Sequence, residues 1–184
     1  NMTKNYFKQN NNIGLRVLGE KDIDTWLSWL HDDRVLEYMN KGQFPFTVLT
    51  QKEHLNSINN SKNEILFGIE VINDHSLIGI IGLHQIDWTH RKGSISIIVG
   101  SREYAGKGYG TQAVSLMIKH AFFKLNLRKL IAGCWAINEA SKKIFLNNGF
   151  LEEGLIRESY FYDGAYIDEI RLGLTRSEYK DDKE

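Results

Sequence analysis

The chain has little cysteine, little proline and no long apolar run, and each shortage excludes a class of protein. Its single cysteine, Cys134, leaves no internal disulfide framework and no cysteine-built metal cage. No apolar run approaches the ~20 residues of a membrane-spanning helix, and the polar start lacks the apolar core of a signal peptide. We therefore expect a soluble, cytoplasmic protein with no membrane partner and no metal.

A surplus of charge of one sign is also lacking, since 23 acidic residues balance 23 basic ones. A protein that binds nucleic acid through bulk electrostatics carries a basic surplus, so no nucleic-acid partner is expected. The balanced total says nothing about where the charges lie, and a local charged pocket stays open.

With one proline, Pro45, and no low-complexity tract, the sequence has no linker at which to divide it. Its 184 residues, of which 42% are hydrophobic, suffice for one well-buried core. We expect a flexible lead over residues 1–12, a single domain over 13–176 and a polar tail over 177–184.

The hydrophobic pattern predicts a strand, two helices, three strands, a helix, a strand, a helix and a hairpin, which is a mixed α/β layer order. Strands are expected over 13–18, 65–72, 76–86, 94–100 and 129–136, helices over 21–30, 50–59, 114–125 and 139–148, and the hairpin over 155–174. Thr50–Glu53 has capping-box spacing, Asn138 suits a helix N-cap, Gly149 suits a helix end, and Asp163-Gly164 suits a hairpin turn.

The stretch "SREYAGKGYGTQA", residues 101–113, crowds Gly106, Gly108 and Gly110 between a strand and a helix. The first N–H groups of a helix are unpaired and partially positive, and bare glycine backbone lets an anion approach them. The stretch lacks the ending of a nucleotide-hydrolase phosphate loop and the spacing of a dinucleotide-binding turn. A tight turn without a ligand is the alternative, but three glycines exceed what a turn needs. The pattern therefore predicts a phosphate site.

Two segments carry a family resemblance. "REYAGKGYGTQA" resembles the acyl-CoA-binding signature of the GNAT acetyltransferase superfamily, and "NEASKKIFLNNGF" resembles its downstream motif of Asn-x-x-Ser/Ala, a helix and Gly-Phe. The element order from Ile13 to Leu174 matches as well, most closely in the ribosomal-protein N-terminal and spermidine acetyltransferase branch. The resemblance implies the acyl-CoA N-acyltransferase fold, with a mostly antiparallel sheet splayed at the cofactor site and helices on both faces.

The same resemblance implies where acetyl-CoA binds. The strand before the glycines pairs its free backbone groups with the pantetheine arm, and the amides of residues 106–111 hold the pyrophosphate, with the Thr111 hydroxyl as an extra donor. Asn138 contacts the cofactor arm as well as capping its helix. The implied cofactor-binding set is Ile98, Val99, Ala105, Gly106, Lys107, Gly108, Tyr109, Gly110, Thr111, Asn138, Ser141 and Phe145.

Two positions depart from the family pattern. Ala105 stands where glutamine or arginine is common, which removes one polar contact with the cofactor. Phe145 stands where many members have the tyrosine that protonates the departing thiolate, and phenylalanine has no proton to give. Ser141 is therefore the expected hydrogen-bond donor to the CoA sulfur, as the matching serine is in ribosomal-type relatives.

The acceptor side is less defined. Tyr160 stands where those relatives have an acid, and Glu158, two residues earlier, is expected on the same strand face as a substitute that binds or deprotonates the amine. His84, Asp87 and His90 follow a strand end, where they are candidates for lining the acceptor cleft. The alternative for Glu158 and for these histidines is a solvated surface position, which is the more common one for such residues.

The sequence thus predicts an acetyl-CoA-dependent N-acetyltransferase that acts by direct transfer in a ternary complex. The expected acceptor is a small-molecule amine or a protein N-terminus, and a homodimer is compatible with the aromatic hairpin. The alternative is a non-catalytic acyl-CoA-binding sensor, which the absence of a tyrosine at Phe145 and of a glutamate in "GSISII" would favour.

Overall fold

The computed structural model describes residues 6–181. The helices are α1 (Ile23–Leu30), α2 (Asp33–Leu36), α3 (Val48–Asn59), α4 (Tyr109–Phe123) and α5 (Glu139–Asn147), with 3₁₀ turns η1 (Glu20–Asp22) and η2 (Arg102–Tyr104). The strands are β1 (Lys8–Gln9), β2 (Ile13–Arg16), β3 (Ile65–Val71), β4 (Leu77–Asp87), β5 (Lys92–Val99), β6 (Lys129–Trp135), β7 (Leu151–Tyr162) and β8 (Ala165–Thr175).

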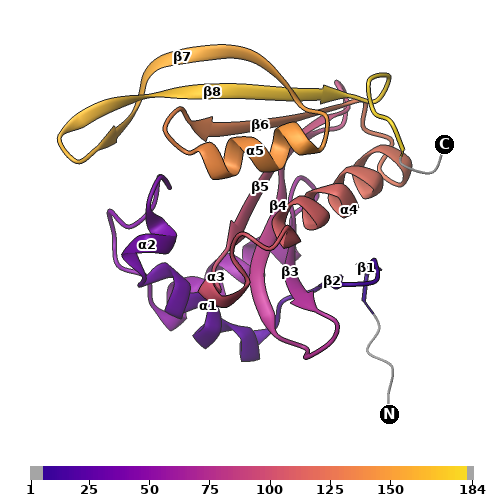
Figure 1. The fold of residues 1–184 in the computed structure, drawn as a ribbon. Coiled ribbons are helices and arrows are strands. Elements are labelled where there is room, and N and C mark those ends of the chain that lie inside the picture. The colour runs from indigo at the N-terminus through magenta and orange to yellow at the C-terminus, as the bar shows by residue number, and fades with distance from the viewer. Residues whose placement is uncertain (1–5, 182–184) are drawn as a thin grey trace.

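These strands form one sheet in the order β1-β2-β3-β4-β5-β6-β8-β7, in which only the β5–β6 pair is parallel (Figure 1). The expected mixed fold with a mostly antiparallel sheet is confirmed. Two parallel strands that follow each other in the chain need a crossover connection. Here α4 connects β5 to β6, and the glycine stretch lies between the end of β5 and the start of α4.

Helices pack on both faces of the sheet, and buried strand side chains point alternately to one face and the other. On one face the fully buried α4 residues Val114, Met117 and Ile118 pack with strand residues such as Ile81 and Ile95. On the other face α1 and α3 form a smaller cluster, whose buried members are Leu18, Trp26, Trp29, Leu30, Leu55 and Ile80. The 3.6-residue period predicted for α4 is therefore confirmed by its packing.

Several boundaries differ from expectation. The capping box of α3 is Thr47–Thr50 rather than Thr50–Glu53, because Thr47 accepts the Thr50 backbone N–H at 3.1 Å and starts the helix two residues earlier. The four-residue α2 has too little apolar period to be recognised in sequence. Its Asp32 N-cap instead receives the Arg34 N–H at 3.1 Å.

The expected flexible lead and polar tail both contact the domain. Lys8–Gln9 pairs with β2, and the Phe7 ring stacks on Phe67 with centroids 4.8 Å apart, while residues 1–5 lie outside the described residues. At the other end Tyr179 packs against Phe122, and residues 182–184 lie outside the described residues. Part of the N-terminal lead therefore belongs to the sheet, and part of the C-terminal tail packs against the core.

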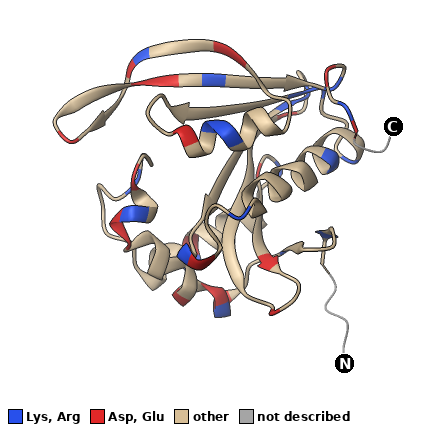
Figure 2. Ribbon diagram, viewed as in Figure 1, with Lys and Arg blue, Asp and Glu red and all other residues tan. Residues whose placement is uncertain are grey.

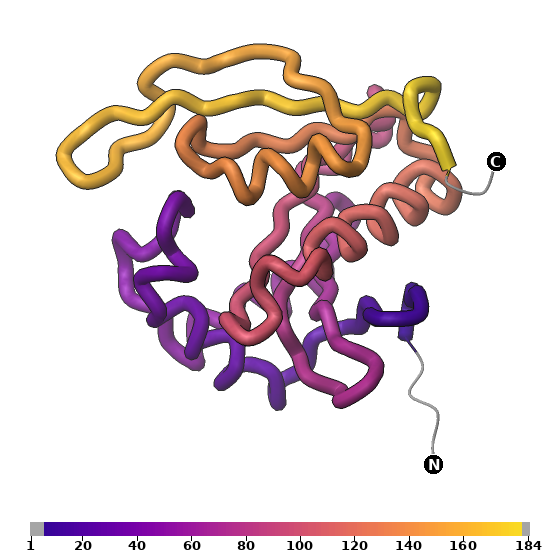
Figure 3. The backbone as a smooth tube through the Cα atoms, in the orientation of Figure 1, coloured from indigo at the N-terminus to yellow at the C-terminus, as the bar shows by residue number. Residues whose placement is uncertain are grey.

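The β7–β8 hairpin reaches past the end of β6 as a long arm (Figure 3). It turns at Asp163 and Gly164, as predicted, and both residues have positive φ, +47° and +80°. This is the backbone that a two-residue turn between twisted strands requires.

Acidic and basic residues are interspersed over the elements, in keeping with the balanced sequence (Figure 2). Within residues 6–181, no helix has the length and apolar character needed to cross a membrane.

Candidate active site

The centre of the sheet is split between β5 and β6. The two strands pair only over Lys92–Ser94 and Lys129–Ile131, and both continue beyond the last pair without meeting again. We call this opening the splay. Along the splay, the backbone N–H and C=O groups of Ile97, Ile98 and Val99 on the β6 side have no strand partner. An extended ligand can hydrogen-bond to them as an added strand would.

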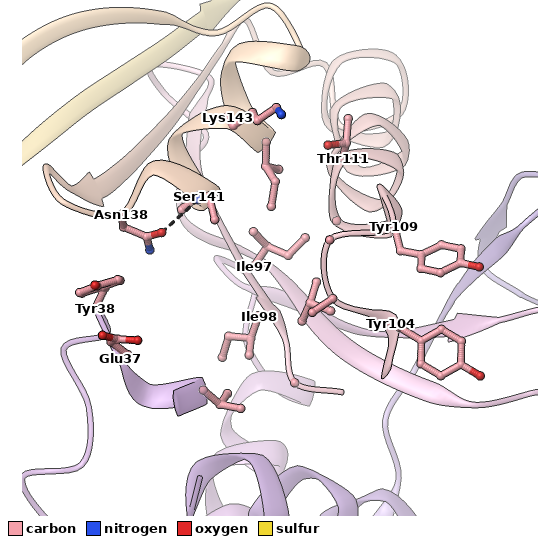
Figure 4. A pocket seen from close by; sticks show the side chains of 18 of the residues that line it. Glu37, Tyr38, Ile97, Ile98, Tyr104, Tyr109, Thr111, Asn138, Ser141 and Lys143 are labelled. Atoms are coloured by element: carbon pink, nitrogen blue, oxygen red, sulfur yellow. Dashed lines mark hydrogen bonds between the residues drawn. The ribbon is translucent and has the colours of Figure 1, made fainter. Parts of the chain in front are cut away.

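A cavity of about 830 Å³ occupies the splay. Its lining comes from β5, the glycine stretch, the start of α4, the first turns of α5, and the segment after α1 (Figure 4). Of the residues predicted to bind cofactor it includes Ile98, Val99, Ala105, Gly106, Gly108, Tyr109, Gly110, Thr111, Asn138 and Ser141. Two motifs some thirty residues apart in sequence therefore meet at one cavity.

The three glycines have different reasons to be glycine. Gly106 and Gly108 have positive φ, +73° and +83°, which favours glycine. Both line the cavity with nothing within 4 Å of where a Cβ would stand, so their backbone is bare toward the ligand. A Cβ on Gly110 would lie 3.0 Å from the Ile144 Cδ1, so this glycine instead lets α4 pack closely on α5.

The glycine stretch is held in place from both sides. The Arg102 guanidinium donates to the Asp32 carboxylate at 3.0 and 2.5 Å, which ties η2 to the N-cap of α2. The Tyr104 hydroxyl donates to Asp74 in the turn between β3 and β4. Gly108 then caps α4, so the amides at the N-terminus of that fifteen-residue helix border the cavity. A helix start with exposed amides binds phosphate oxygens well.

Asn138 caps α5, as predicted, and its Oδ1 accepts the Ser141 backbone N–H at 3.1 Å. This bond fixes the first turn of α5, and with it the place of Ser141 at the cavity wall (Figure 4). The helix ends as expected, with Gly149 at φ +84°.

Replacing Asn138 with alanine removes this cap and is expected to lower the free energy of unfolding by roughly 0.5–2 kcal/mol. Asn138→Ser keeps a side-chain acceptor and should lose much less. Chemical denaturation of both variants checks the difference, and equal stabilities would show that the cap contributes little.

The segment after α2 supplies cavity residues that the sequence analysis did not identify. Glu37 and Tyr38 lie on one side of the cavity, with Asn138 and Ser141 above them (Figure 4). Tyr38 has φ +61°, a conformation that only a few per cent of non-glycine residues adopt. Neither periodicity nor a motif marks this segment, so only the tertiary structure brings it to the site.

Aromatic rings extend from Tyr38 toward the hairpin. Trp135, at the end of β6, is stacked on Tyr160 with centroids 5.0 Å apart and meets Tyr162 edge-on at 5.4 Å. The Tyr38 ring neighbours the rings of both Trp135 and Tyr162, with centroid distances of 6.2 and 5.9 Å. Burial, followed by the nearby Glu169 carboxylate, raises the pKa of Tyr160, so its phenol is a weaker acid than an exposed tyrosine.

Four residues of the predicted catalytic and cofactor-binding set do not line the cavity, and neither do the acceptor-cleft candidates His84, Asp87 and His90. Phe145 is 2% exposed and packs edge-on against Phe150, so it belongs to the core. The Lys107 Nζ lies over the Tyr104 ring, 5.3 Å from its centroid. Glu158 is exposed on β7, and Tyr160 is engaged by Trp135.

Glu158 and Tyr160 also fail the expected same-face relation. The β7–β8 register shifts between Ile156 and Tyr160, and Glu158 has φ +53°. A bulge of this kind interrupts strict alternation, so the two-residue spacing does not put the two side chains on one face.

Cys134 offers no nucleophile to the site. It is 4% exposed in the core, and burial raises its pKa to about 11. A buried, protonated thiol is inert, in keeping with transfer that does not pass through an acyl-cysteine.

Comparison with known proteins decides the family. A family model described as acetyltransferase (GNAT) domain matches residues 12–151, which is most of the chain. The chain belongs to the GNAT acetyltransferase family.

Relatives of this GNAT protein carry more detail. YdaF of Bacillus subtilis, whose name assigns it provisionally to ribosomal N-acetyltransferases, is 30% identical over 96% of this chain and 98% of its own. Spermidine N(1)-acetyltransferase of Escherichia coli is 34% identical over 58% of this chain and 56% of its own. A crystal structure of spermidine N-acetyltransferase from Vibrio cholerae with CoA and spermine superposes with a TM-score of 0.85, at 25% identity, over 92% of this chain and 99% of that one.

The family and these relatives make the chain an acetyl-CoA-dependent N-acetyltransferase whose acceptor is an amine. The enzyme, rather than the non-catalytic sensor, is therefore the function supported for this GNAT domain.

Proposed function

We propose that this GNAT enzyme transfers the acetyl group directly, in a ternary complex, to the single primary amine of a protein N-terminus. The pyrophosphate of acetyl-CoA sits on the amides of residues 106–111, and the pantetheine arm lies along the free edge of Ile98 and Val99. Ser141, on the opposite wall of the same cavity, donates a hydrogen bond to the sulfur as the thiolate leaves.

The charge of the cavity supports an acceptor with one ammonium group. Among the described residues that line it, Glu37 is the only carboxylate, whereas Arg34, Arg102 and Lys143 are basic. A polyamine carries several ammonium groups and calls for several acids. One carboxylate, Glu37, beside the Tyr38 ring suits an acceptor that carries a single ammonium group, such as a protein N-terminus.

Spermidine is the second candidate, because the overall match to a spermidine acetyltransferase solved with spermine covers nearly the whole chain. The homodimer, the cytoplasmic location and the lack of nucleic-acid or membrane partners stay predictions.

An acceptor panel separates the two candidates. CoA thiol release is measured with short peptides that have a free α-amine and blocked lysines, with the same peptides acetylated at the N-terminus, and with spermidine. We expect turnover with a free-amine peptide to exceed that with spermidine by at least about tenfold in kcat/KM, and none with the blocked peptides. Faster turnover of spermidine would overturn the protein-terminus proposal and leave the acetyltransferase itself in place.

A further inference from the structure

The face of the sheet opposite α4 is open at the splay. Ser94 forms the last pair with Ile131, and the next residues on this face are Ser96 on β5 and Gly133 on β6, given the alternation of strands. Both are exposed, although both lie on central strands. The Glu169 Oε1 lies 2.5 Å from where a Gly133 Cβ would stand, so that carboxylate covers the glycine. Ser96 is next to the cavity-lining Ile97, and a ligand that reaches the splay from this side meets the Ser96 hydroxyl on the β5 edge.

Ser96 is one end of a chain of hydrogen bonds. Its Oγ lies 2.7 Å from the His84 Nε2, and the His84 Nδ1 lies 3.4 Å from the Glu64 Oε1. A carboxylate only accepts, so the Nδ1 carries the proton, and the neutral ring then accepts the Ser96 hydroxyl proton at Nε2. Of the three candidates expected after a strand end, His84 and Asp87 lie within β4, and His84 alone joins such a chain. Asp87 instead accepts the His90 backbone N–H at 2.8 Å within the β4–β5 turn.

We propose that Ser96, His84 and Glu64 form the proton relay that neutralises the acceptor amine. The ammonium gives a proton to the Ser96 Oγ as the Ser96 hydroxyl gives its own to the His84 Nε2. The products are a neutral amine, ready to attack the thioester, and an imidazolium paired with the Glu64 carboxylate. His84 is partly exposed, so the imidazolium then releases the proton to water.

An imidazole is a base whose ordinary strength matches neutral pH. Two further carboxylates lie on this side. Glu37 is assigned above to binding the ammonium, and Glu169 is 4% exposed and is occupied by Arg171 at 2.6 Å and Ser159 at 2.8 Å. The relay also explains how this strand serves an amine substrate with serines in "GSISII" and no glutamate.

Two further groups influence the relay. The Glu64 carboxylate, before β3, lies 3.4 Å from the His84 Nδ1, and His54 on α3 interacts electrostatically with both residues. Burial, followed by the nearby Lys41 ammonium, lowers the pKa of His54, so this neighbour is neutral at pH 7.

The inference rests on acetyl transfer to an amine, and its test uses whichever acceptor of the panel above the wild-type enzyme turns over fastest. His84→Gln is expected to lower kcat/KM for that acceptor about 100-fold at pH 7. The dissociation constant for CoA should stay within about twofold, because the relay lies on the acceptor side. Ser96→Ala should show a similar loss, and Glu64→Gln a smaller one.

The pH dependence distinguishes a relay from a structural role. As the pH approaches the pKa of the free amine, solvent supplies neutral amine and the base becomes dispensable. The His84→Gln defect should therefore shrink from about 100-fold at pH 7 to below about tenfold at pH 9. His90→Gln, in the β4–β5 turn, is the matched control and should behave as the wild type.

A defect of equal size at pH 7 and pH 9, or no defect, would overturn the relay. Because the wild-type enzyme is active in this experiment, either outcome leaves the acetyltransferase function standing. Ser96→Ala removes one hydroxyl from an exposed position, so its effect is measured in a folded protein even if His84→Gln lowers the melting temperature.

Discussion

Replacing Gly108 with alanine is expected to raise the dissociation constant for CoA on the order of 100-fold, which is about 2.7 kcal/mol. Gly108 has φ +83° and caps α4 at the wall of the cavity. A Cβ there points into open space that we assign to the pyrophosphate, so it hinders approach to the α4 amides. Isothermal titration of CoA into the variant measures the loss.

Gly164→Ala separates this effect from backbone strain. Gly164 has φ +80°, also with nothing near a would-be Cβ, but it lies in the hairpin turn away from the cavity. Both substitutions should destabilise the fold by a similar amount, about 1–2 kcal/mol, since both put a side chain on left-handed backbone. Only Gly108→Ala should weaken CoA binding, and equal CoA affinities in the two variants would contradict the phosphate site.

Ser141→Ala is expected to lower kcat on the order of 100-fold, with KM for acetyl-CoA changed by less than about threefold. The expected asymmetry follows from what the hydroxyl does, because charge develops on sulfur only as the thioester breaks. Position 145, where many family members have the tyrosine, cannot supply a proton, since Phe145 is a phenylalanine buried against Phe150. Initial rates of thiol release over a range of acetyl-CoA concentrations measure both constants.

The control for Ser141→Ala is Ser28→Ala, on α1 outside the cavity, where the hydroxyl donates to the Thr25 carbonyl at 2.6 Å. It should leave both constants unchanged. A Ser141 variant with normal kcat and a raised KM would assign the hydroxyl to holding the cofactor arm, and the thiolate role would then be wrong.

Local patterns in the sequence predicted most of the element order and the glycine stretch between β5 and α4, but not β1, α2 or the parallel β5–β6 pair. Glycines at a strand-to-helix junction and an asparagine before a helix act through backbone geometry within a few residues. The cap at Asn138, the helix end at Gly149 and the turn at Asp163-Gly164 were for that reason predictable.

The acceptor side was decided by tertiary structure. Glu37 and Tyr38 reach the cavity from a segment without period or motif, and His84 meets Ser96 and Glu64 across three different parts of the chain. A β-bulge that the sequence does not predict interrupts the alternation between Glu158 and Tyr160. The backbone conformation of the glycine stretch and of the α5 cap follows from their own residues. The groups that we propose for the acceptor side are instead brought together by sheet register and by the packing of segments remote in sequence.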